Sequence, residues 1–179
     1  MPSNNVVSEV QRRAADPAAS VWVAANAGAG KTKVLTDRVL RLLVSGSAPE
    51  RILCLTYTKA AAAEMANRIH ARLQQWLVMP AAELKKALEV LTGEVPKKQM
   101  LVRARQLFAT VMDAPEGLRI MTIHSLCQSL LQRFALEAGV SPYFTVMDER
   151  DATRLMEEAR LRLLSVRGDH PDHQLLYYA

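Results

Sequence analysis

The chain has 179 residues, 50% of them hydrophobic and 23% charged, and a formal net charge of +5. This balance is typical of a soluble globular chain with one domain, or one domain and part of a second. The first residues lack the basic and apolar segments of a signal peptide, and no apolar run is long enough to span a bilayer. These features argue against secretion and membrane insertion, and they predict a cytoplasmic protein with no membrane contact. The modest positive charge alone does not identify a nucleic-acid partner.

The two cysteines also indicate a reducing compartment. Cys54 falls in an apolar strand pattern and Cys127 in a helical one. Both are therefore expected to be buried free thiols and not members of a disulfide framework.

A weak helical period covers residues 5–15, and Asp16-Pro17 closes the segment. Gln11 lies in it. The side-chain amide of Gln11 can donate and accept a hydrogen bond at once, which matches the donor and acceptor on an adenine edge. A glutamine on a solvated helix face needs no ligand, so this residue alone does not separate the two interpretations.

Residues 20–35 are the central feature of the sequence: an apolar run, a turn of small residues and a helical pattern, which predict strand, phosphate loop and helix. Gly28 and Gly30 let the main chain approach an anion, and the helix N-terminus favours negative charge. Lys31 is expected to reach the outer phosphates and Thr32 to offer its hydroxyl to Mg²⁺. The pattern G-x-x-x-x-G-K-[ST] is met except at its first position, where alanine replaces glycine. The loop and helix start comprise Ala25, Asn26, Ala27, Gly28, Ala29, Gly30, Lys31, Thr32 and Lys33.

A second buried strand is predicted at residues 51–58, and a strong helix former begins at Lys59, with Glu64 and Arg68 spaced as a surface pair. Strand, helix and strand in succession imply a parallel sheet. The polar residues 56–58 fall at the carboxyl end of the second strand, where open α/β sheets bind their ligands.

After Pro80, two helical segments at residues 81–91 and 97–112 form an inserted pair. Its basic residues can form either a solvated face or a DNA-contacting face, and their spacing favours the solvated face. They are Lys85, Lys86, Lys97, Lys98, Arg103 and Arg105.

A third strand is predicted at residues 118–123, followed by a helix for which Gly139 is a suitable C-cap. Thr122, His124 and Ser125 stand at this strand end. They can contact a nucleic-acid backbone or cap the helix that follows, and the spacing favours the cap.

The remaining residues contain an apolar stretch that ends in Asp148 and Glu149, followed by an amphipathic helix at residues 152–166. The two carboxylates are a candidate magnesium pair, but the run is short and follows Pro142. His170 and His173 lack the further ligands of a metal site, so they are expected in an exposed tail.

Four strings occur together in order: Gln11, A-N-A-G-A-G-K-T, T-Y-T-K-A-A-A-A-E-M and T-I-H-S-L-C-Q-S-L-L. Together they resemble the N-terminal motor segment of superfamily 1 DNA helicases of the UvrD type. The flanking text resembles most the AddA-type helicase-nuclease subunits of bacterial double-strand-break repair. The likeness runs from Gln11 to about Asp151, and the family often shows the alanine at position 25.

The resemblance implies a role for each matching position. Tyr57 stands where the family commonly has Phe, Lys59 stands where many relatives carry Asn, and the F-x-V-x-D-E string resembles the start of an accessory subdomain. The implied nucleotide-binding residues are Gln11 and 25–33, with Lys31 and Thr32 catalytic and Thr32 on Mg²⁺. The implied DNA-binding residues are Thr56, Tyr57, Thr58, Lys59, Thr122 and His124.

We therefore expect an α/β fold, a partial P-loop (RecA-like) parallel sheet flanked by helices. The predicted bounds are 1–79 for the first part of subdomain 1A, 80–117 for a helical insertion, 118–140 for the return to 1A and 141–179 for the start of a helical subdomain 1B. The resemblance implies the N-terminal fragment of an ATP-dependent 3′–5′ DNA helicase-nuclease, with ATP and Mg²⁺ as cofactors. The fragment itself is expected to bind Mg-nucleotide weakly and to be inactive.

The implied partners are single- and double-stranded DNA and an AddB-type protein, and unpaired sheet edges make a homodimer of the fragment an expectation. Two alternatives stay open. One is a small self-contained P-loop kinase or nucleotide-binding regulator in which Asp148 and Glu149 hold Mg²⁺. The other is a non-catalytic DNA-binding module that uses the basic helices.

Overall fold

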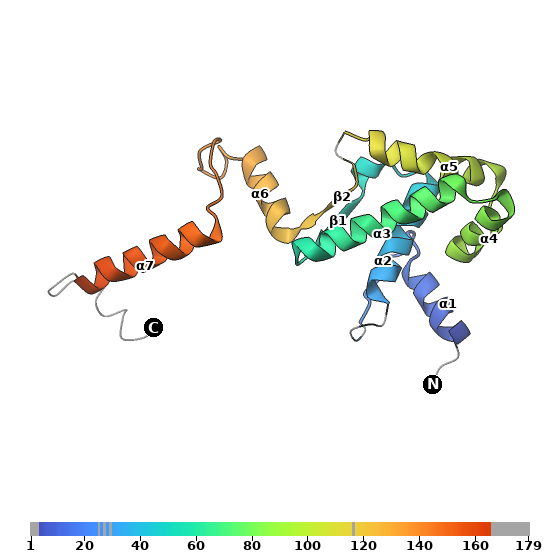
Figure 1. Ribbon diagram of the computed structural model, residues 1–179, viewed down its shortest axis with the longest axis horizontal. Helices are drawn as coiled ribbons and strands as arrows, with labels where there is room; N and C mark the ends of the chain where they lie inside the picture. The colour runs from blue at the N-terminus through green and yellow to red at the C-terminus, as the bar shows by residue number, and fades with distance from the viewer. Residues whose placement is uncertain (1–3, 25, 27, 29, 116, 166–179) are drawn as a thin grey trace. The chain divides into compact units, whose positions relative to one another are not determined.

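The computed structural model describes residues 4–24, 26, 28, 30–115 and 117–165. The chain divides into two compact units at residues 126 and 127. The elements in chain order are α1 (Asn4–Ala14), α2 (Lys31–Ser45), a 3-10 turn (Pro49–Arg51), β1 (Leu53–Thr56), α3 (Lys59–Val78), α4 (Ala81–Thr92), α5 (Lys98–Asp113), β2 (Arg119–Thr122), α6 (Ile123–Arg133) and α7 (Glu149–Ser165) (Figure 1).

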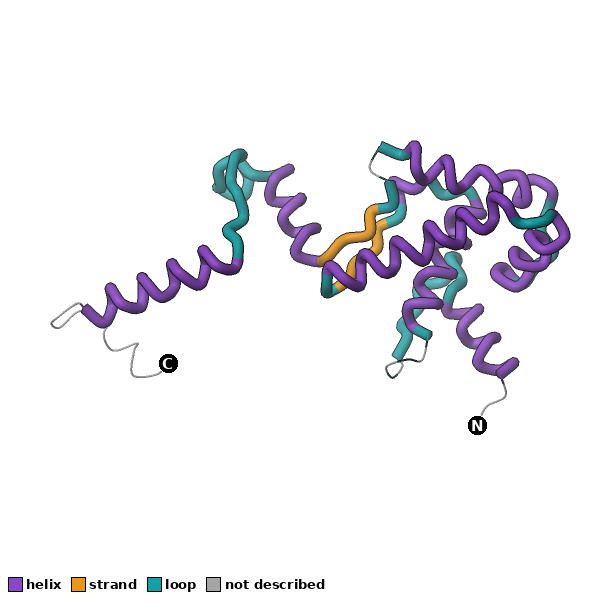
Figure 2. The backbone as a smooth tube through the Cα atoms, viewed as in Figure 1, coloured by secondary structure: helices purple, strands orange, loops and turns teal. Residues whose placement is uncertain are grey.

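Helix α3 is the centre of the first unit. Its alanine-rich start and straight-chain residues favour helix, and its apolar residues recur every three or four positions. These residues face a core shared with α2 and α5, and α3 also contacts both strands (Figure 2). The helix ends before Pro80, because a residue that precedes proline is held in extended backbone, as Met79 is with ψ 138°. Its buried residues are Ala62, Met65, Ile69, Leu73 and Trp76.

The inserted helices α4 and α5 belong to the same core. Leu84 and Leu88 of α4 and Leu107 of α5 are buried in the cluster that contains Leu40 and Leu43 of α2. The helices predicted at residues 81–91 and 97–112 are thus confirmed as elements, and they stabilise the unit that carries the phosphate loop. The domain bounds assigned from the sequence stay predictions.

The sheet has two parallel strands. Register pairs Leu53 with Arg119 and Thr56 with Thr122, so both strands end at the same edge. This parallel pair flanked by helices confirms the expected partial RecA-like α/β class.

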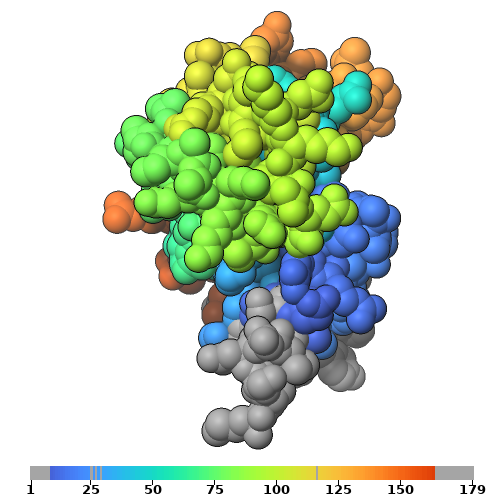
Figure 3. Space-filling view, turned by 90° about the vertical axis from the view of Figure 1, so that its right-hand side faces the viewer, coloured from blue at the N-terminus to red at the C-terminus, as the bar shows by residue number. Residues whose placement is uncertain are grey.

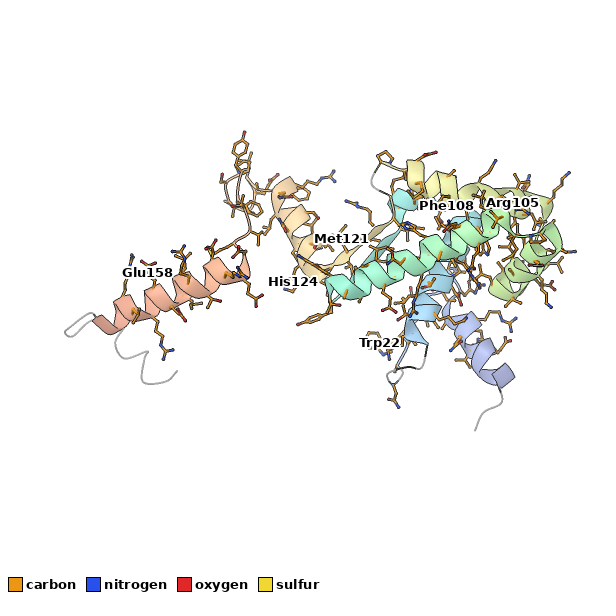
Figure 4. The ribbon with its side chains drawn as sticks, viewed as in Figure 1. Trp22, Arg105, Phe108, Met121, His124 and Glu158 are labelled. Atoms are coloured by element: carbon orange, nitrogen blue, oxygen red, sulfur yellow. The ribbon has the colours of Figure 1, made fainter. Side chains whose placement is uncertain are left out.

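The strand predicted at residues 20–24 is wrong. These residues belong to no strand, and the side chains of Val21, Trp22 and Val23 are exposed, Trp22 by 93%. Trp22 is labelled in Figure 4. A strand requires a hydrogen-bonding neighbour. Strands β1 and β2 pair with each other, and no strand in the described part of the chain lies beside this segment.

Two further sequence predictions are wrong in the second unit. Helix α6 ends at Arg133, and Gly139, although its φ is +67°, lies in the turns that follow and is not the cap. Cys127 is exposed, whereas Cys54 is partly buried, and burial raises the pKa of the Cys54 thiol. None of the helices formed by the described residues is long and apolar enough to cross a membrane.

Candidate nucleotide and DNA site

The phosphate loop leads into α2 through two glycines in left-handed backbone. Gly28 has φ +79° and Gly30 has φ +87°, a conformation that costs other residues about 1–2 kcal/mol. Gly30 is also the N-cap of α2 and offers no side chain, so the first N–H groups of the helix have no side-chain cap. Uncapped N–H groups at a helix start are suited to bind an anion. The predicted site residues Ala25, Ala27 and Ala29 lie outside the described residues.

Lys31 folds back over this loop. Its Nζ donates a hydrogen bond of 2.7 Å to the carbonyl oxygen of Asn26. Lys33, two positions further along, pairs with Asp37 at 2.6 Å, and Thr32 is half-buried in the first turn of α2. The cation that the motif assigns to phosphate thus lies at the loop.

Gln11 of α1 lies against the same loop. A Cβ built on Gly30 would be 2.9 Å from Nε2 of Gln11, so the side-chain amide packs directly on the glycine. Two residues that the sequence assigned to one nucleotide, from different helices, are therefore brought together.

Two arginines of α2 hold the chain that carries Gln11, and sequence reasoning missed both. Arg38 donates to the carbonyl oxygens of Asp16 at 2.6 Å and Ala19 at 2.8 Å. Arg41 donates to the carbonyl oxygen of Arg12 at 2.8 Å. Their sequence spacing shows only a polar helix face. The carbonyls that they serve become visible only in the tertiary structure.

At the carboxyl ends of the strands, the threonine hydroxyls are engaged in local structure. Thr56 donates to the carbonyl oxygen of Thr58 at 3.0 Å, and Thr58 caps α3 by accepting from the N–H of Ala61 at 3.1 Å. Thr122 is 6% exposed and accepts from the N–H of Ser125 at 3.1 Å. The capping role predicted at this second strand end is confirmed.

The same edge also presents side chains to solvent. Tyr57 is 80% exposed, and Lys59 and His124 are exposed. His124 is labelled in Figure 4 at the start of α6. Because β1 and β2 end in register, the sheet edge offers an aromatic ring, an ammonium group and an imidazole beside threonines that shape the two turns.

The basic residues of the insertion have two different roles. The four lysines are exposed on α4 and α5 or just before them, as the solvated face predicted. Arg105, labelled in Figure 4, instead donates to the carbonyl oxygens of Leu77 at 2.7 Å and Met79 at 2.6 Å, at the end of α3. Arg103 donates to the carbonyl oxygen of Val44 at 2.9 Å, near the end of α2.

Asp148 is a helix cap in this structure. Its carboxylate accepts a hydrogen bond of 2.8 Å from the N–H of Asp151, and α7 begins at Glu149. The carboxylate of Asp148 therefore has a structural task at the start of α7. No group of three or more metal-binding side chains occurs within the described ranges. His170 and His173 lie outside those ranges.

A parallel sheet flanked by helices, with a glycine loop that opens a helix, defines this chain as a P-loop α/β protein. The chain belongs to the UvrD/REP helicase family, because the description of the N-terminal domain of that family matches residues 7–175.

The curated relatives share one name, which describes the AddA component of an ATP-dependent helicase/nuclease. The protein of Lactobacillus gasseri is 29% identical over 176 residues, covering 97% of this chain and 13% of the relative. That of Desulforudis audaxviator is 37% identical over 142 residues, covering 78% of this chain and 10% of the relative. That of Enterococcus faecalis is 31% identical over 158 residues, covering 88% of this chain and 11% of the relative. The chain thus spans about a tenth of the length of these relatives.

Proposed function

We propose that this chain is the ATP-binding motor segment of an ATP-dependent DNA helicase-nuclease. The observation that carries the proposal is the packing of Gln11 on Gly30, which puts an adenine-reading amide beside an uncapped helix N-terminus. The family and the shared name of the relatives support the helicase role. We extend the proposal to 3′–5′ movement in double-strand-break repair, in the cytoplasm, together with an AddB-type protein.

In this proposal each loop residue has a distinct task. Backbone N–H groups from Gly30 onward receive the phosphates, and Lys31 exchanges the carbonyl of Asn26 for the β- and γ-phosphate oxygens. The hydroxyl of Thr32 contacts the Mg²⁺ that accompanies ATP, and the amide of Gln11 pairs with the adenine edge.

Single-stranded DNA would bind at the common edge of β1 and β2. The ring of Tyr57 is exposed and can stack on a base of any identity, which a motor that moves over all sequences requires. Lys59 and His124 can approach the phosphates. The three threonines shape the turns and contact the strand through their backbone.

The test is Mg-ATP binding to the 179-residue chain, followed with a fluorescent ATP analogue. Lys31→Ala should weaken binding at least about tenfold, because it removes the charge that balances the outer phosphates. Lys86→Ala is the matched control, since it removes an equal charge from an exposed position of α4. Equal binding by both variants, or no binding by the unaltered chain, would contradict the proposal.

A further inference from the structure

Three helices of the first unit meet around one guanidinium group. Nη1 of Arg41, on α2, donates to the carbonyl oxygen of Arg12 at 2.8 Å, and Nη2 donates to the carbonyl oxygen of Thr92 at 3.3 Å. The first acceptor is in the last turn of α1 and the second is the last residue of α4. In Figure 3 the surface of α4 borders that of α1 at this end of the unit.

Such a fork suits its position. The last carbonyl groups of a helix have no partner within the helix, and a planar guanidinium can serve two of them at once. Both hydrogen bonds are partly buried, which shields them from competing water. Arg41 thereby ends two helices with one side chain.

A second contact joins the same helices. Gly93, the C-cap of α4 with φ +81°, lies against the side chain of Arg12, whose Cδ is 3.3 Å from where a Cβ of Gly93 would stand. Arg12 also pairs with Glu9 on α1. The end of the inserted helix α4 and the last turn of α1 are therefore in direct contact.

The residue immediately before Arg12 is Gln11. We infer that Arg41 is a positioning residue for recognition of the nucleotide base: it ties the last turn of α1 to α2 and α4, and so keeps the Gln11 amide against Gly30. The inserted helical pair then helps to set base selectivity, in addition to its place in the core. This inference rests on the proposed function, in which Gln11 reads adenine.

A tie of this kind affects one quantity more than others. Phosphate binding depends on the loop and on Lys31, whereas the hydrogen bonds of Arg41 go to the ends of α1 and α4, and base discrimination depends on where α1 places its amide. Removal of the tie should lower the preference for ATP over GTP and leave affinity for inorganic tripolyphosphate within about twofold.

The experiment measures dissociation constants for Mg-ATP, Mg-GTP and tripolyphosphate with the full 179-residue chain. Arg41→Met keeps the length and apolar stem of the side chain but donates nothing. Arg103→Met is the matched control, because Arg103 also donates to a carbonyl near a helix end, that of Val44, but does not contact α1 through that bond. Gln11→Ala measures the selectivity that the amide itself supplies.

We expect Gln11→Ala to lower the GTP-to-ATP ratio of dissociation constants on the order of tenfold, and Arg41→Met to lower it by a similar factor. The variant that combines both substitutions should lose no more selectivity than Gln11→Ala alone, because Arg41 acts through Gln11. Arg41→Lys, which can still donate to a carbonyl, should give an intermediate ratio, and Arg103→Met the unaltered one.

An unchanged ratio in Arg41→Met, with a lowered ratio in Gln11→Ala, would overturn the inference and leave the proposed function intact. An unchanged ratio in Gln11→Ala would overturn both. If circular dichroism shows that Arg41→Met does not fold, Arg41→Lys decides, and an unaltered ratio in that variant counts against the inference.

Discussion

The contact between Gln11 and Gly30 leads to a sharp prediction when Gly30→Ala is compared with Gly28→Ala. Both glycines have left-handed backbone, with φ +87° and +79°, so each substitution should cost about 1–2 kcal/mol of folding free energy. The surroundings differ. A Cβ on Gly30 would stand 2.9 Å from Nε2 of Gln11, whereas nothing lies within 4 Å of a Cβ on Gly28.

A separation of 2.9 Å is too short for a carbon beside an amide nitrogen, so the Gln11 side chain must move in Gly30→Ala. It is flexible, so its displacement adds little to the stability loss but removes it from the adenine edge. We expect similar drops in melting temperature for the two variants, at roughly 2–4 °C per kcal/mol.

The two variants should then differ in base selectivity. Only Gly30→Ala is expected to lower the ATP preference over GTP, on the order of tenfold, because a good pair of hydrogen bonds to a base edge is worth about 1–3 kcal/mol. Taking the ratio of the two dissociation constants cancels the general weakening of phosphate binding that both loop variants share. An equal change of this ratio in both variants would refute the account of Gln11.

Other predictions concern the sheet edge, the core and the thiols. Tyr57→Ala should weaken binding of single-stranded DNA by about 1–3 kcal/mol in fluorescence anisotropy, whereas Tyr143→Ala, which alters an equally exposed ring, should not. Arg105→Met should lower the free energy of unfolding in urea by about 1–3 kcal/mol, because carbonyls at the end of α3 lose their donor; an unaffected midpoint would contradict that role. Iodoacetamide should label exposed Cys127 before Cys54, since burial raises the pKa of the Cys54 thiol and leaves less thiolate to react.

Features set by neighbouring residues were the predictable ones. The helix that begins at Lys59 follows from alanine propensity and from the Thr58 cap three residues before Ala61, and the Thr122 cap follows from the same spacing. The left-handed glycine at position 30 follows from the motif itself.

Features set by distant partners were not predictable in the same way. The apolar run at residues 20–24 carries the composition of a strand but lacks a hydrogen-bonding neighbour among the described strands. Arg41 and Arg105 look like solvated charges in the sequence, because the carbonyls that they bind belong to other helices. Cys127 lies on a helical pattern whose apolar side is exposed here.

The central claim is that Gln11 and the phosphate loop form one nucleotide site. The most direct measurement is a titration of the ¹⁵N-labelled chain with Mg²⁺ and a non-hydrolysable ATP analogue, followed by two-dimensional NMR. We predict that the side-chain amide of Gln11 and the backbone amides of Gly28, Gly30 and Thr32 shift together at one dissociation constant, while those of α7 stay in place. Shifts confined to other helices, or a Gln11 amide that does not respond while the loop does, would contradict the claim.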